Sequence, residues 1–291
     1  AITSNLMKNS DLLSPRHSYV RLYVNGEYFG IRHLEESFSK EFLEDSKRRN
    51  GPVLGLEETN DLESNVLNKH NVRYEISDLK NWEKTNIKLA INSLTLAELI
   101  EHKPELVKKY FDQKRWANYF ALIDLVASYH GAIIKSVKLY LNPITGLFEP
   151  VFFDGHRFSI NTFDDLYLVD FMQLKDEEIK SDFIFYNKHW FRSFFGTKDN
   201  PNIDFYKEYF KALELYSSEN YYSKVFSKIV KDYGPVRGFI YRELHGFDRV
   251  RGNGESNILP HLAQITHWEA RIKKIREDVE KAKLRNPLIF V

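Results

Sequence analysis

Two segments of this chain have the residue alternation and turn residues of β-hairpins, and they constrain the fold more than any other feature. The first, residues 19–36, reads YVRLYVNGEYFGIRHLEE, and Asn25-Gly26 at its centre is typical of a two-residue hairpin turn. The second, residues 135–156, reads KSVKLYLNPITGLFEPVFFDGH and turns over residues 142–146. The chain is therefore expected to contain two antiparallel strand pairs.

The turn of the first hairpin fixes how its strands pair. A uniform register pairs Leu22 with Phe29 and Val20 with Ile31, which predicts one apolar face. Gly30 interrupts the second strand. A glycine within a strand often marks the close approach of a ligand or another chain, and the alternative is a simple packing contact between strands.

Both hairpins end in acidic residues. The first leads through Glu35 and Glu36 into a predicted helix, and the second ends at Asp154 after the apolar run FEPVFF. Because burying an unpaired carboxylate is costly, Asp154 is expected beside a cleft, where such a residue commonly holds a divalent cation. The alternatives are an ordinary Asp-Gly turn with Gly155, and acidic residues that only favour the dipole of a helix.

Other polar residues near the hairpins are candidate ligands. His130 ends a predicted helix, either as a cap or as a ligand. Lys135 and Lys138 follow it, and their spacing in a strand places them on opposite faces, so only one can face a cleft. The pair His33-x-Glu35 resembles metal-ligand spacing, but no second histidine follows at a helical interval, so a zinc-hydrolase site is not predicted.

The composition predicts a folded globular protein in which any anion-binding site depends on a local group of charges. The 291 residues are 43% hydrophobic and 15% aromatic, which is sufficient for a sizeable core. The net charge of +1 gives no general attraction to nucleic acid or to anionic membranes. There is no cysteine, which excludes disulfides and thiolate chemistry, and no apolar run approaches the roughly 20 residues of a membrane span.

Outside the hairpins the residue pattern is mainly helical. Helices are expected over six segments: 36–49, 83–101, 104–130, 203–216, 218–232 and 260–285. The helix over 104–130 is apolar almost all round and is therefore expected in the core. Residues 59–81 predict a long polar loop with short elements, 160–200 an irregular region and 249–257 an exposed loop. Strands at the front and helices behind predict an α+β fold.

Together the two hairpins resemble the sequence blocks of the CotH kinase family. The run VRLYVNGEYFGIRHLEE is similar to the family's NGEYWG-type hairpin, which an acidic position follows. The run NYFALIDLVASYHGAIIKSVKLYLNPITGLFEPVFFD is similar to a second block, in which a helix precedes a short strand, a turn and a strand ending in Trp-Asp. The resemblance covers about residues 16–160.

The resemblance implies an atypical protein-kinase-like fold with N-terminal antiparallel β-hairpins and a largely helical C-terminal half. Residues 1–82 would form an N-lobe-like region, and residues 83–291 a C-lobe-like region that contains the hairpin at 135–154. Members of the family bind ATP with a divalent metal, Mg²⁺ or Mn²⁺, and spore-coat members phosphorylate other coat proteins on Ser. Phosphoryl transfer depends on positioning and on cations over the phosphates.

The resemblance also assigns site residues. Asp154 matches the family's metal-binding Asp, and Glu35 or Glu36 matches the acidic position after the first hairpin. The typical ending Trp-Asp-x-Asp reads FDGH over residues 153–156, so His156 replaces the second carboxylate as a candidate metal ligand.

Several charged positions of the family differ in this chain. His130 stands where an Asp typically follows the central helix, Ser136 aligns near a usual Asn, and the position of a phosphate-binding Lys falls near Gly55. Losing charged ligands weakens magnesium binding, which relies on carboxylates and substrate phosphates. The candidates for a relocated nucleotide-binding cation are Arg32, Lys135 and Lys138.

The favoured function is an ATP- and metal-dependent phosphotransferase that acts on protein Ser or Thr. In this hypothesis Asp154 holds the metal and one glutamate of the pair Glu35-Glu36 positions the nucleotide-binding cation. Asp124 or His130 assists the acceptor.

Two alternatives compete with this function. The replaced ligands favour a catalytically degenerate, pseudokinase-like interaction module in a bacterial envelope or surface assembly. Aromatic residues such as Trp190 and Trp268 raise a weaker carbohydrate-binding hypothesis, since aromatics more often belong to a core and no carboxylate pair is suitably placed. The expected partner is a protein substrate or an assembly partner, not nucleic acid.

Overall fold

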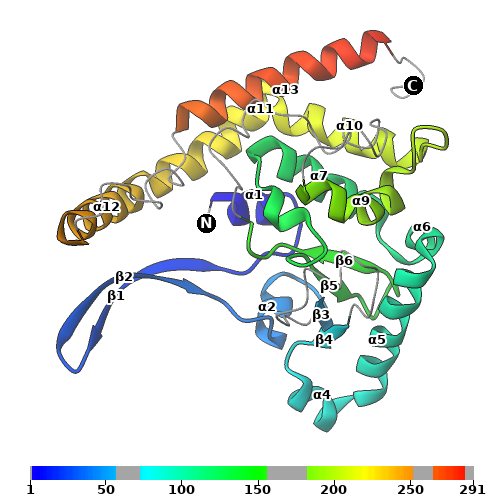
Figure 1. The fold of residues 1–291 in the computed structure, drawn as a ribbon, viewed down its shortest axis with the longest axis horizontal. Helices are drawn as coiled ribbons and strands as arrows, with labels where there is room; N and C mark the ends of the chain where they lie inside the picture. The colour runs from blue at the N-terminus through cyan, green and yellow to red at the C-terminus, as the bar shows by residue number, and fades with distance from the viewer. Residues whose placement is uncertain (1, 57–72, 156–181, 252–264, 286–291) are drawn as a thin grey trace.

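The computed structural model of the chain describes residues 2–56, 73–155, 182–251 and 265–285 (Figure 1). Within these ranges, the antiparallel strands lie between residues 17 and 151, and the elements that follow are helices. The predicted α+β class is therefore confirmed. No helix of the described ranges is both long enough and apolar enough to cross a membrane.

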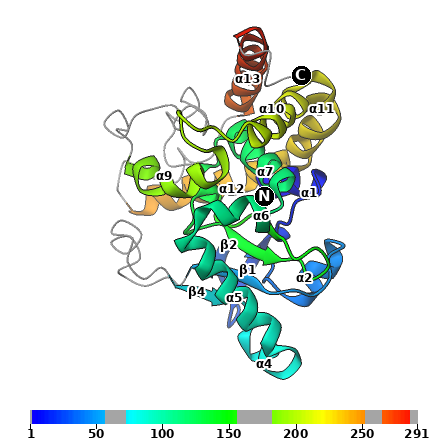
Figure 2. The same ribbon diagram turned by 90° about the vertical axis from the view of Figure 1, so that its right-hand side faces the viewer.

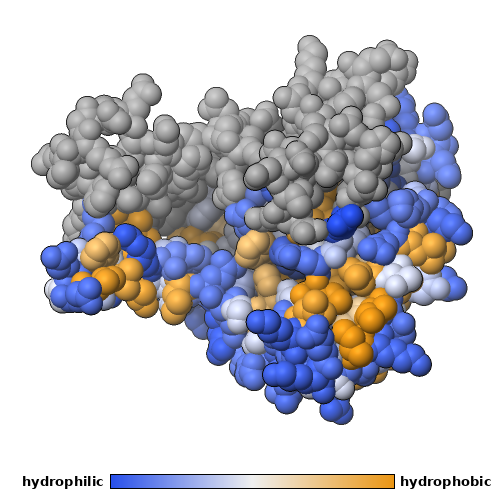
Figure 3. All heavy atoms as spheres, turned by 60° about the horizontal axis from the view of Figure 1, so that its bottom comes forward, coloured by the Kyte–Doolittle hydropathy of each residue, from blue (hydrophilic) through white to orange (hydrophobic). Residues whose placement is uncertain are grey.

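The first hairpin forms a sheet of its own and projects from the body of the molecule (Figure 1). Its strands are β1 (His17–Val24) and β2 (Glu27–Glu35), and most of their residues are exposed on both faces. The predicted apolar face is therefore not buried in the core. Figure 3 shows hydrophobic residues of this hairpin exposed among hydrophilic ones, at the left of the view.

A β-bulge changes the predicted register of this hairpin. Next to the turn, Val24 pairs with Glu27 as predicted, but further along one residue of β1 faces two residues of β2. The extra residue lies at Gly30, whose φ of +84° is in the left-handed region that favours glycine. The predicted partner of Val20 is therefore wrong by one residue, because Val20 pairs with Arg32.

The second hairpin lies in a buried four-stranded antiparallel sheet with the strand order β4-β3-β5-β6. The strands are β3 (Val53–Leu56), β4 (Tyr74–Ile76), β5 (Lys138–Leu141) and β6 (Phe148–Val151). Every residue of β3, β5 and β6 is buried, which confirms the interior position predicted for FEPV. The sequence did not predict β3 and β4. These two strands precede residue 82, the expected boundary between two regions, and they form one sheet with β5 and β6, which follow it.

Helices account for most of the remaining described chain. Up to the second hairpin they are α1 (Ile2–Asn9), α2 (Lys40–Asp45), α4 (Leu79–Thr85), α5 (Ile87–His102), η1 (Pro104–Leu106), α6 (Val107–Tyr110), α7 (Gln113–Val126) and η2 (Tyr129–Ala132). After it they are α9 (Asp182–Phe195), α10 (Ile203–Ser217), α11 (Glu219–Tyr221), the π-helical η5 (Tyr222–Phe226), α12 (Ser227–Arg251) and α13 (Ile265–Arg285).

The central helix is shorter than predicted because its two ends are capped. Asp112 begins α7, and its Oδ1 accepts a hydrogen bond from the backbone N of Arg115 at 3.0 Å. Ala127 ends the helix in a left-handed conformation, with φ +54°. His130 therefore lies in the separate short helix η2 and not in the last turn of α7.

Other expectations also differ from the structure. The region 160–200, expected to be irregular, contains α9. The helix predicted to end at 232 continues through Pro235 as part of α12. The loop expected over 249–257 is helical up to residue 251, and its remainder lies outside the described residues.

The helix α7 is the buried centre of the fold, as its apolar sequence predicts. Figures 1 and 2 show it between α10 and α13 on one side and the sheet on the other. Its Trp116 packs against Phe194 of α9, with ring centroids 4.9 Å apart, and donates its indole N–H to the carbonyl of Phe148 in β6 at 3.0 Å. The helix α13 adds three buried residues to this core: Ile272, Ile275 and Val279.

Candidate functional site

Asp154 and His130 lie in contact beside the end of β6. Asp154 adopts a left-handed conformation, with φ +44°, and its side chain is 48% exposed. His130 Nδ1 lies 3.2 Å from Asp154 Oδ2 and 2.9 Å from the backbone oxygen of Asp154. The hydroxyl of Ser136 lies 2.9 Å from the same nitrogen. The structure therefore brings two of the predicted catalytic residues together in one polar cluster.

Lys138 extends from β5 across the sheet to Gly55 of β3. Its side chain is buried, and a Cβ placed on Gly55 would collide with the Cδ and Nζ of Lys138. The space that a side chain at residue 55 would need is thus filled by the lysine. Nζ of Lys138 also lies 5.1 Å from the ring centre of Phe153, the residue before Asp154.

The two glutamates after the first hairpin have different surroundings. Burial raises the pKa of Glu36, but hydrogen bonds from Arg16 outweigh this effect and lower the pKa overall. Arg16 donates from Nε at 3.0 Å and from its backbone N at 3.1 Å. Burial raises the pKa of Glu35, and the nearby charge of Asp154 adds to the shift. Glu35 therefore lies within electrostatic range of the Asp154 cluster, while Glu36 is held by Arg16.

Asp124 is fully buried in α7. Tyr209 of α10 donates its hydroxyl to Asp124 Oδ2, and Arg271 of α13 donates from Nε to the backbone oxygen of Asp124 at 2.5 Å. Arg271 also donates to the hydroxyl of Tyr129 at 2.6 Å. These contacts connect α7 to α10 and α13, so Asp124 has a clear structural role in the core.

Three predicted site residues remain, and the structure describes two of them. Arg32 is exposed on β2, where its Nη1 donates to the carbonyl of Ile31 at 3.1 Å. Lys135 is half-buried in the turn between η2 and β5. His156 lies outside the described residues. The functional roles predicted for Arg32, Lys135 and His156 stay predictions.

The two tryptophans considered for carbohydrate binding pack in the interior. Trp190 is buried and donates its indole N–H to the carbonyl of Ala132 at 3.0 Å. Trp268 is partly buried and packs edge-on against Phe226, with ring centroids 6.0 Å apart. Their positions agree with a core role, which is the usual one for aromatic residues.

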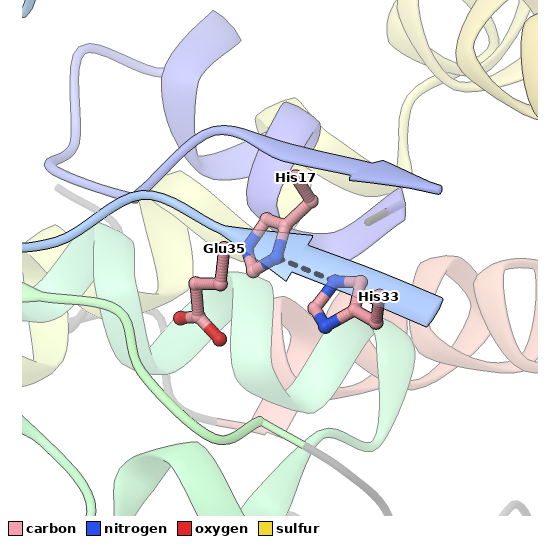
Figure 4. Close-up of side chains that lie close together, drawn as sticks. All are labelled: His17, His33 and Glu35. Carbon is pink, nitrogen blue, oxygen red and sulfur yellow. Dashed lines mark hydrogen bonds between the residues drawn. The ribbon is translucent and has the colours of Figure 1, made fainter. Parts of the chain in front are cut away.

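The base of the first hairpin holds a further cluster, formed by His17, His33 and Glu35. Figure 4 shows the ring of His17 between the other two side chains. His17 Nδ1 lies 2.8 Å from His33 Nε2, and one ligand atom from each of the three residues lies within 4.8 Å of the others. The sequence showed only His33-x-Glu35, and His17 joins it because it pairs with Glu35 across the strands.

Both imidazoles of this cluster are less basic than usual. Burial and, to a smaller extent, nearby positive charges together lower the pKa of His17 to about 3. Burial also lowers the pKa of His33. The Nε2 of His17 and the Oε1 of Glu35 are buried and have no hydrogen-bond partner among the residues that the structure describes.

Comparison with known proteins identifies the family. A family model described as CotH kinase protein matches residues 1–197, which is more than half of the chain. No curated protein matches the sequence. The described fold, with antiparallel hairpin sheets before a helical C-terminal half, fits the kinase-like fold of that family. The chain belongs to the CotH kinase family.

Proposed function

We propose that this protein transfers the γ-phosphoryl group of ATP to a Ser or Thr of a partner protein, with Mg²⁺ or Mn²⁺ as the metal. Membership of the CotH kinase family makes a kinase-like activity the first expectation. The surroundings of Asp154, Lys138 and Glu35 then indicate how this chain could perform it although several of the family's usual ligands are replaced.

The observation that carries the proposal is the position of Lys138 over Gly55. The family resemblance places a phosphate-binding lysine near residue 55, where this chain has glycine. The ammonium of Lys138 reaches that place from the neighbouring strand, and a side chain at residue 55 would collide with it. Lys138 of β5 therefore places a positive charge at the point of the sheet where the family's lysine would extend from β3.

The residues present fit a nucleotide with a bound metal. Asp154 offers a half-exposed carboxylate, and Mg²⁺ commonly binds through one or two carboxylates and takes its other ligands from phosphates and water. In this proposal Asp154 holds the metal, Lys138 contacts the phosphates, and Glu35 orients the cationic groups. When bound, the metal would neutralise charge that develops on the phosphates.

His130 is the residue best placed to assist the acceptor hydroxyl. During transfer, the bond between the acceptor oxygen and the γ-phosphorus forms while the bond to the leaving ADP oxygen breaks. The acceptor proton needs a base, and His130 lies against Asp154, whereas Asp124 is enclosed between helices. We therefore assign this part to His130.

The experiment is transfer of label from γ-labelled ATP, with Mg²⁺ or Mn²⁺, to the protein itself and to a general Ser/Thr protein acceptor. The wild type should transfer label. Asp154→Asn and Lys138→Met should each reduce transfer by about a hundredfold or more, which is the scale for losing an electrostatic contact to a transition state. Lys80→Met, which alters an exposed lysine of α4, is the matched control and should transfer label normally.

A second function, a non-catalytic interaction module, is favoured by the exposed apolar residues of the first hairpin. The labelling assay on the wild-type protein, together with its melting temperature with and without Mg-ATP, distinguishes the two functions. If the wild type transfers no label and Mg-ATP does not raise its melting temperature, the phosphotransferase proposal fails and the interaction module takes its place.

A further inference from the structure

We propose that His17, His33 and Glu35 form a binding site for a divalent transition-metal ion of the zinc class at the base of the first hairpin. The site shares Glu35 with the proposed ATP site but takes a different class of metal, and Zn²⁺ binding can be measured without phosphotransfer.

The donor set selects the class of metal. Imidazole nitrogen suits zinc and other first-row transition metals, whereas magnesium requires oxygen ligands. Two histidines with one glutamate form a ligand set that zinc enzymes use, with a fourth position left open. Asp154, by contrast, offers a half-exposed carboxylate and no second histidine of this cluster, and an oxygen ligand suits a metal held by nucleotide phosphates.

The geometry is close to that of a metal site before any metal is bound. For bonds of about 2.0–2.1 Å in a tetrahedral site, neighbouring ligand atoms lie about 3.3 Å apart. The nearest nitrogens of His17 and His33 are 2.8 Å apart, and all three ligand atoms fall within 4.8 Å of one another. Small side-chain rotations would therefore complete the arrangement without moving the backbone.

The polar atoms of the cluster are incompletely satisfied without a ligand. The Nε2 of His17 and the Oε1 of Glu35 are buried and lack hydrogen-bond partners among the described residues. Leaving a buried polar atom unpaired is unfavourable, because the atom has lost its hydrogen bonds to water. A metal ion bound through Glu35 Oε1 would offset that cost at Glu35. His17 would bind the ion through Nδ1, the nitrogen beside His33, so its Nε2 would gain no partner from the metal.

The bulge at Gly30 is what assembles the site. A uniform register around the Asn25-Gly26 turn would place His17 opposite Leu34, whose side chain points to the other face from Glu35. The extra residue at Gly30 shifts the pairing by one, so that His17 faces Glu35, with His33 two residues away on the same face.

The test is titration of the full chain with Zn²⁺ alone, in competition with a chromogenic chelator, and with Co²⁺ to record the absorption of the bound ion. The wild type should bind one equivalent of Zn²⁺ and give the intense visible bands of four-coordinate Co²⁺. His17→Ala and His33→Ala should each weaken binding by at least about tenfold, because changes in groups around metal ligands already have effects of that size. His102→Ala, at the exposed end of α5, is the matched control.

Two further variants distinguish this site from zinc binding at Asp154 and test the part played by the bulge. Gly30→Val changes no ligand, but a branched residue is strained at a φ of +84°, so Zn²⁺ affinity should fall as it does for the histidine variants. Asp154→Asn should bind Zn²⁺ like the wild type even where it abolishes phosphotransfer. Circular dichroism identifies any variant that fails to fold.

The proposal is overturned if the wild type binds no Zn²⁺, or if a folded variant that lacks both His17 and His33 binds it with unchanged affinity. It is also overturned if Mg²⁺ displaces Zn²⁺ at equal concentration, because oxygen ligands elsewhere would then account for the binding.

Discussion

The two hairpins that dominate the sequence have opposite environments in the structure. Every residue of β5 and β6 is buried within a four-stranded sheet, whereas β1 and β2 form a separate pair that is mostly exposed. The core fixes the position of the β5-β6 hairpin, and with it the position of Asp154. The projecting hairpin is held by its own cross-strand contacts and by contacts of single side chains with the rest of the protein.

Among the described residues, the polar contacts that connect the projecting hairpin to the rest of the protein come from single side chains. The Tyr28 hydroxyl donates to the carboxylate of Glu243 on α12, and Arg16, which also binds Glu36 across the base of the hairpin, lies 3.5 Å from Asp45 of α2. A two-stranded hairpin is at best marginally stable alone in water. A metal at His17, His33 and Glu35 would thus matter more here than the same ion would in the buried sheet.

The largest difference expected between the two hairpins is in the cost of removing an aromatic side chain. Phe148→Ala in β6 removes a side chain that is 0% exposed, so the free energy of unfolding should fall by about 3–5 kcal/mol. Phe29→Ala in β2 removes one that is 46% exposed, and the loss should be about 0.5 kcal/mol. Urea unfolding followed by circular dichroism measures both. Equal losses would contradict the assignment of one hairpin to the core and the other to the surface.

A smaller difference is expected between the ion pairs of the two regions. Glu149 of β6 is 3% exposed, and it accepts hydrogen bonds from Arg48 Nε at 2.8 Å and from the Asn142 amide at 2.7 Å. Glu149→Gln removes the buried carboxylate that pairs with Arg48 and Arg115 and leaves Arg48 with Asp11 as its acidic partner, which should cost about 3 kcal/mol. Glu36→Gln removes a pair whose arginine is largely exposed, and should cost less than about 1 kcal/mol. Equal costs in the same urea measurement would count against this difference in burial.

The smallest expected effect is the pH dependence that Glu36 contributes. Its folded-state pKa lies below the usual 4.5, so its contribution to stability is fully present above that pH and is lost as the pH falls through the folded-state pKa. The wild type should therefore lose slightly more stability than Glu36→Gln between about pH 6 and about pH 3. Added salt should reduce the difference, because Arg16 is exposed. Identical pH profiles at low salt would show that the pair contributes nothing.

Local patterns in the sequence predicted those parts of the fold that depend on neighbouring residues. Asn25-Gly26 predicted the hairpin turn, and the apolar run of α7 predicted a buried helix. The strands β3 and β4 were missed because VLGL and YEI are too short to show alternation. Tertiary pairing with β5 makes VLGL a central strand.

The candidate site shows the same limit. Asp154 and His130 were identified separately, but their contact depends on how η2 packs against the end of β6, which no spacing in the sequence reveals. Gly30 appeared as a break in a strand, and its role as a bulge emerged only with the observed pairing. Because a shift of one residue exchanges the two faces of a strand, His17 could not be linked to Glu35 beforehand.

The most direct test of the proposed function is a crystal structure of the protein with Mn²⁺ and a non-hydrolysable ATP analogue, with anomalous scattering used to locate the ion. We expect an Mn²⁺ peak at the Asp154 carboxylate and phosphate density within reach of Lys138 Nζ. Nucleotide bound elsewhere, or an Asp154 carboxylate without metal at saturating ligand, would contradict the proposed function.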